Sequence, residues 1–110
     1  MPNPDSDFHR EMLNTYEQAK TECKYTANRF MQMVAELGGV ATAKRLLATS
    51  TPSDGFTTLW ECERLYLTVE FAVLKKEFAS LFSDDERATA KQRLLDYRFN
   101  LSKYEDILLI

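Results

Sequence analysis

The sequence predicts an all-α fold, a compact bundle of five or six short helices. Its 110 residues include only three glycines and three prolines, the residues that most often interrupt helices. Apolar residues recur at steps of three and four along most of the chain, which places them on one face of a helix. Only residues 65–74 alternate as a strand does, and the chain offers them no partner strand.

Three helices are expected in the first half of the chain. The first runs to about residue 24, and the second begins near residue 26. The sequence leaves open whether these two are one long helix, because nothing between them forces a break. Gly38 and Gly39 end the second helix, since glycine readily adopts the left-handed conformation that follows a helix. The third helix covers residues 40–48.

A loop over residues 49–55 precedes a fourth helix over residues 56–64, which Ser53 or Asp54 can cap. The loop combines small hydroxylic residues with a proline and an Asp-Gly pair, each of which favours a turn. Residues 65–74 fit a strand or a helix. We expect a helix, because a strand has to pair and no second convincing strand exists.

Ser83 and Glu86 give the clearest local signal, a capping box that begins a helix running to about residue 97. The last four residues are all apolar, which indicates that they pack on something. We therefore expect one helical domain over residues 1–110, with a disordered lead at residues 1–6 and a C-terminal tail at residues 98–110.

Composition and charge narrow the function classes. The net charge of −3 supplies no broad positive field of the kind that phosphate-binding domains show. Cys23 and Cys62 fit neither a disulfide framework nor a metal site, so we expect two small buried side chains and no metal or cofactor. The lone His9 is expected to be solvated. Because no signal-like or membrane-spanning segment is found, we expect a cytoplasmic protein.

The segment from Ser53 to Glu70 is the candidate binding site. It contains the only tryptophan, two glutamates beside apolar positions, and a helix N-terminus whose free N–H groups can bind an anion. Tryptophan offers the large rigid face that binding hot spots favour. The candidate binding residues are Ser53, Asp54, Trp60, Glu61, Arg64 and Glu70. None is assigned as catalytic.

Several of these residues also have a purely structural interpretation. Trp60 can fill the core, and Glu61 can form a surface pair with Arg64 at i, i+3. Glu70 can face water in the first turn of its helix. Alternatively, Glu70 is a partly buried carboxylate bonded to Arg64 or Arg45.

Contact with nucleic acid is an alternative function. Gly38-Gly39 joins two helices by a short turn, as in a helix-turn-helix, and the second of them contains Lys44 and Arg45. The double glycine departs from that motif, as does a charged residue where the motif has an apolar one. The contact would need Arg29, Lys44 and Arg45 on one open face.

A set of short motifs runs along residues 25–97. They are Arg29-Phe30-x-x-Met33-Val34, Gly38-Gly39-Val40-x-x-Ala43-Lys44-x-Leu46-Leu47, Ser53-Asp54-Gly55-Phe56-Thr57-Thr58-Leu59-Trp60-Glu61, Leu67-Thr68-Val69-Glu70 and Val73-Leu74-x-x-Glu77-Phe78-x-x-Leu81-Phe82. In these motifs the chain resembles an uncharacterised family of bacterial all-helical domains. That family often has a proline before the residue matching Glu77, which implies a helix boundary near Lys75. The resemblance implies no established activity.

We therefore expect a non-catalytic binding or interaction module. Its expected partner is a protein, either a second copy of this chain or a larger bacterial protein, and no membrane partner is expected. The alternatives are an accessory domain that contacts nucleic acid and an enzyme that uses Glu61 or Glu70.

Overall fold

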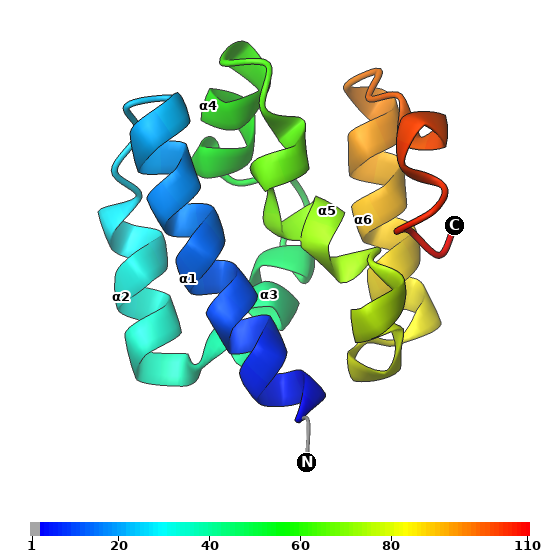
Figure 1. Ribbon diagram of the computed structural model, residues 1–110, viewed down its shortest axis with the longest axis horizontal. Coiled ribbons are helices and arrows are strands. Elements are labelled where there is room, and N and C mark those ends of the chain that lie inside the picture. The colour runs from blue at the N-terminus through cyan, green and yellow to red at the C-terminus, as the bar shows by residue number, and fades with distance from the viewer. Residues whose placement is uncertain (1–2) are drawn as a thin grey trace.

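The computed structural model describes residues 3–110, and helices joined by short turns make up most of it (Figure 1). Within this range the α-helices are α1 Pro4–Glu22, α2 Asn28–Leu37, α3 Gly39–Leu47, α4 Asp54–Glu61, α5 Val69–Val73 and α6 Asp84–Asp96. The 3-10 helices are η1 Leu65–Leu67, η2 Lys76–Leu81 and η3 Leu101–Tyr104. Residues 3–110 form no strand beyond an isolated bridge between Lys75 and Leu108. The all-α prediction is confirmed.

The helices pack around a core that α1, α3, α5 and α6 share. Figure 1 shows α1 and α2 side by side on one flank and α6 on the opposite flank, with α5 between them. Helix α1 packs on α3 and η2, and α5 packs on α6. The buried ring of Phe8 meets the rings of Phe78 and Phe82 edge to face, with centroids 5.1 and 5.0 Å apart.

The N-terminal segment differs from the predicted disordered lead over residues 1–6. Residues 1 and 2 lie outside the described part of the chain. The side chain of Asn3 caps α1 by accepting a hydrogen bond from the Asp5 N–H at 3.0 Å, and Pro4 occupies the first helical position. Both residues suit these positions, because a short polar side chain caps free N–H groups and proline has none to satisfy. Residues 4–6 are therefore helical.

Two tight turns separate the first three helices. Lys24 adopts a left-handed φ of 54°, which interrupts the helical conformation. The chain therefore forms two separate helices, α1 and α2, at this place. Gly38, with φ of 87°, ends α2 and begins α3. A Cβ on Gly39 would lie 2.7 Å from the His9 Cα, so only glycine fits where α3 crosses α1.

We expected His9 to be solvated, but its side chain forms a hydrogen bond at this crossing of α1 and α3. Its Nδ1 accepts a hydrogen bond from the Gly39 N–H at 3.1 Å, and its side chain is only partly exposed. The first N–H groups of a helix have no partner within the helix, so this contact satisfies one of them. His9 therefore serves as a cap for α3 from a neighbouring helix.

The ambiguous stretch over residues 65–74 is helical, as expected, and consists of η1 and α5. Thr68 caps α5 by accepting a hydrogen bond from the Phe71 N–H at 3.2 Å. Lys75 then adopts an extended conformation and separates α5 from η2. The boundary expected near Lys75 is present. All five residues of α5 are buried. The helix therefore has no polar face that would produce a helical period in the sequence, and the alternation of residue types resembled a strand instead.

The capping box predicted at the start of α6 is confirmed. The predicted packing of the apolar C-terminal residues is confirmed for only some of them. Ser83 N–H donates to Glu86 Oε1 at 2.9 Å, and Glu86 N–H donates to Ser83 Oγ at 3.1 Å. In the tail, Leu108 is buried and the Leu109 N–H donates to the Leu74 carbonyl at 2.9 Å. Ile107, Leu109 and Ile110 remain exposed.

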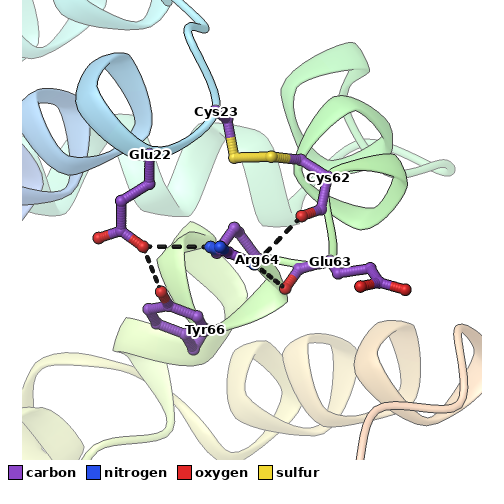
Figure 2. Close-up of a disulfide and its surroundings, with 6 residues drawn as sticks. All are labelled: Glu22, Cys23, Cys62, Glu63, Arg64 and Tyr66. Atoms are coloured by element: carbon purple, nitrogen blue, oxygen red, sulfur yellow. Dashed lines mark hydrogen bonds and ion pairs between the residues drawn. A yellow bond between two sulfur atoms is a disulfide. The ribbon is translucent and has the colours of Figure 1, made fainter.

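Cys23 and Cys62 form a disulfide, so the expectation of two unpaired buried cysteines is wrong. Each follows the last turn of a helix, Cys23 after α1 and Cys62 after α4, and their Cα atoms are 6.0 Å apart (Figure 2). Beside the bond, the Glu22 carboxylate accepts from Arg64 Nε at 3.1 Å and from the Tyr66 hydroxyl (Figure 2). The ends of α1 and α4 are thus joined covalently and by an ionic network.

Removing the disulfide should destabilise the fold. The bond joins residues 39 positions apart, and closing a loop of that length restricts the unfolded chain by about 3–4 kcal/mol. We expect Cys23→Ser/Cys62→Ser to lose about that much free energy of unfolding, measured by urea denaturation. The double variant should not respond to a reductant. Equal stability of the wild-type chain with and without reductant would contradict the prediction.

Candidate functional site

A pocket of about 360 Å³ opens between α1, α2, α4 and the start of α5. Most of its wall is apolar, because each of these helices turns part of its hydrophobic face toward the pocket. The apolar wall residues come from six elements and from Ala27, which precedes α2. They are Ala19 of α1, Phe30 and Met33 of α2, Leu46 of α3, Phe56 and Leu59 of α4, Leu67 of η1 and Val69 of α5. The pocket is therefore a cavity that several helices create together.

The rim of the pocket is polar. Arg29 of α2 and Asp54 of α4 both line the pocket and are exposed, and their charges are opposite. Tyr25, from the segment between α1 and α2, lies against the N-terminus of α4, with its hydroxyl 3.1 Å from where a Cβ on Gly55 would be. Burial, and then the charge of Asp54, raise the pKa of Tyr25, so this hydroxyl stays protonated and can donate a hydrogen bond.

Glu70 places a buried carboxylate in the wall of the pocket. Its Oε2 accepts from Arg93 Nη1 at 3.0 Å, and both side chains are almost fully buried. Burial raises the pKa of Glu70, and the hydrogen bond and charge of Arg93 oppose that rise. Among residues 3–110, no side chain other than Arg93 donates to this carboxylate.

Arg93 reaches Glu70 from α6 and bonds to several other groups. Its guanidinium donates to the Leu46 carbonyl at 3.1 Å and to the Thr49 carbonyl at 2.6 Å. These carbonyls belong to the end of α3 and the loop that follows. Arg93 therefore satisfies otherwise free carbonyl groups and neutralises Glu70 from behind the pocket wall, since Arg93 itself does not line the pocket.

A second, more open hollow of about 750 Å³ lies between the end of α4, η1 and residues 97–104. Trp60 lines it and is 45% exposed, with its ring edge to face against Tyr97 at 5.2 Å. Phe99 and Tyr104 stack in the same hollow, with ring planes 11° apart. Trp60 is thus a surface residue supported by aromatic contacts, and it does not fill the core.

The structure divides the predicted site residues among three places. Ser53, Asp54 and Glu70 line the pocket, whereas Trp60 and Glu61 line the open hollow. Arg64 lies beside the disulfide and pairs with Glu22, so the expected pair between Glu61 and Arg64 is absent.

Of two further expectations about these residues, the helix cap at Ser53 or Asp54 is confirmed and the partner of Glu70 is corrected. Ser53 is the cap of α4, since its Oγ accepts from the Phe56 N–H at 3.2 Å, and Asp54 is the first helical residue. Glu70 is a buried carboxylate, but its partner is Arg93 and neither Arg64 nor Arg45. Glu61 and Glu70 line different hollows, so these two carboxylates do not face a common substrate.

Sequence reasoning missed Arg93 and Tyr25. Arg93 follows several acidic and basic residues of α6, a pattern typical of a solvent-exposed helix face. The Arg93 side chain is nevertheless buried. One signal was available, because Arg93 lies three residues after the inward-facing Ala90 and so shares its side of α6. Tyr25 lies between two helices, and nothing local indicates that it approaches α4.

The residues proposed for nucleic-acid contact do not form a set of free cations. Lys44 pairs with Glu86 at 2.8 Å, and its ammonium lies 5.3 Å from the centre of the Phe82 ring. Arg29 is at the rim of the pocket, and Arg45 is exposed on α3.

No family model, curated protein or solved structure matches the chain. The resemblance to a bacterial helical domain family therefore stays a prediction. Within residues 3–110, no three metal-binding side chains gather at one place. None of the helices in this part of the chain combines the length and apolar character that a bilayer crossing requires.

Replacing Glu70 should lower stability sharply. In Glu70→Ala the Arg93 guanidinium stays buried without its counter-charge, which costs about 3–5 kcal/mol. Glu61→Ala is the matched control, because Glu61 is exposed and should change the free energy of unfolding by less than about 0.5 kcal/mol. Urea denaturation measures both. Similar small losses in the two variants would show that the buried pair does not matter.

Proposed function

We propose that this chain is a non-catalytic binding module that takes the apolar part of its ligand into the pocket. The observation that supports this most directly is the cavity of about 360 Å³ between α1, α2, α4 and α5. Ligand pockets typically measure about 300–1,000 Å³ and combine apolar walls with a few placed polar groups. The separation of Glu61 from Glu70 favours binding over catalysis by paired carboxylates.

The charge arrangement supports this proposal over nucleic-acid contact. Lys44 forms an ion pair with Glu86, and Arg29 lines the same pocket as the acidic residue Asp54. Phosphate backbones are bound by groups of free Lys and Arg side chains on one surface. Glu86 and Asp54 therefore place acidic charge beside two of these three cations.

The disulfide bears on the compartment in which the module works. Disulfides persist in oxidising compartments and are rare in the reducing cytoplasm. The bond between Cys23 and Cys62 therefore weighs against the cytoplasmic location expected from the sequence. We propose a compartment in which this bond stays oxidised.

Binding of a neutral apolar probe tests the proposal. We expect n-octanol to shift the methyl NMR signals of pocket residues such as Leu46 and Leu59. Met33→Trp should weaken this binding at least tenfold, because the larger side chain fills the cavity that Met33 lines. Leu37→Trp is the control, since Leu37 is on the same helix but exposed and outside the pocket. Shifts in neither pocket residue, or equal loss in both variants, would exclude the pocket as the site.

Recognition of a protein, including a second copy of this chain, is a second candidate function. It is favoured by Trp60, which is half exposed in a hollow whose wall contains four other aromatic side chains, Tyr66, Tyr97, Phe99 and Tyr104. Tryptophan and tyrosine are enriched at binding hot spots.

Sedimentation equilibrium tests self-association through this hollow. We expect the wild-type chain to associate as its concentration rises and Trp60→Ala to remain monomeric over the same range. The variant should keep its helical content, because Trp60 lies outside the core. A wild-type chain that is monomeric throughout would exclude the self-association.

A further inference from the structure

We propose that the ligand of the pocket combines an apolar body with a positively charged amine, and that the amine pairs with the Glu70 carboxylate. This inference rests on the proposed binding function and adds the chemistry of the ligand's polar group. It follows from the distribution of charge along the wall.

The buried ion pair at the pocket wall turns its acidic residue toward the pocket, because Glu70 lines the pocket and its partner Arg93 does not. Three acidic or basic side chains line the pocket: Arg29, Asp54 and Glu70. Arg29 and Asp54 are exposed and opposite in sign, so they largely offset each other at the rim, where solvent screens them. Glu70 is 3% exposed and its partner Arg93 is 6% exposed, so the dipole of this pair acts in a poorly solvated environment, where electrostatic interactions are stronger.

The Glu70 carboxylate can accept further hydrogen bonds. Arg93 donates to Oε2 at 3.0 Å from the α6 side, the backbone N–H of Glu70 also bonds to the carboxylate, and no other side chain within residues 3–110 donates to either oxygen. An ionised carboxylate can accept about four hydrogen bonds in total. Burial raises the pKa of this carboxyl group even with Arg93 beside it, so its ionised form gains from a further positive donor.

An ammonium group fits this position better than a neutral or acidic group. It supplies three N–H donors and a positive charge, whereas a hydroxyl supplies one uncharged donor. Hydrogen bonds to charged groups are roughly twice as strong as neutral ones. A ligand carboxylate would instead meet the like charge of Glu70. We therefore expect an alkylamine to bind about tenfold or more tightly than the alcohol of equal length, and the fatty acid least.

Matched ligands with one apolar chain and different polar groups test this inference. Hexyl, octyl and decyl chains are compared as the ammonium, the alcohol and the carboxylate at neutral pH, below their micelle concentrations, by calorimetry and NMR. The same series is measured with Glu70→Gln, which keeps an oxygen acceptor for Arg93 and removes the charge. Glu17→Gln is the control, because Glu17 is an exposed acidic residue of α1 outside the pocket, and Asp54→Asn tests the rim separately.

The expected result is a preference for the ammonium that Glu70→Gln abolishes, Asp54→Asn reduces less, and Glu17→Gln leaves unchanged. In the wild-type protein, octylammonium should also shift the carboxyl-carbon NMR signal of Glu70, and octanol should shift it less. That signal gives the answer even where Glu70→Gln fails to fold.

Other outcomes separate the two proposals. Equal binding of octanol and octylammonium, or a preference for octanoate, overturns the amine inference and leaves the pocket's binding function standing. A preference that Asp54→Asn abolishes overturns the assignment to Glu70. Binding of none of the probes overturns both proposals.

Discussion

The buried guanidinium of Arg93 is the constraint around which one half of this structure is organised. It bonds to the Glu70 carboxylate on α5 and to carbonyl groups of Leu46 and Thr49, at the end of α3. A charge placed among buried side chains is tolerated only when its donors are satisfied, because desolvation costs several kcal/mol for each ion. The relative positions of α3, α5 and α6 must therefore meet the geometry of one side chain.

The pocket lies near two such constraints, the Glu70–Arg93 ion pair and the disulfide between Cys23 and Cys62. The Glu70–Arg93 pair fixes the start of α5 against α6. The bond between Cys23 and Cys62 joins the ends of α1 and α4 next to the small cluster of Ala19, Leu59 and Leu67. Those three cluster residues also line the pocket. Two strong constraints thus act on elements that line the pocket, although protein interiors are otherwise closely packed.

Local interactions made much of the fold predictable. Ser83 and Glu86 begin α6 because each satisfies a free N–H of the other, and Gly38 ends α2 because it tolerates a positive φ. The helix over residues 65–74 was predicted only indirectly, from the missing partner strand. Its sequence is nearly all apolar because α5 is buried on every side, so no period marks a helix face. For the candidate site, the chain segment was predicted but its division between two hollows was not.

The sequence by itself determined the fold class, the caps and most helix boundaries, because these depend on residues within about four positions of one another. The tertiary structure alone decided which distant groups meet: Cys23 with Cys62, His9 with the Gly39 N–H, and Glu70 with Arg93. Each of these pairs joins different helices, or the turns at their ends, over more than twenty positions of sequence. Such meetings follow from how whole helices pack, and neither cysteine, histidine nor arginine carries a local signal of its partner.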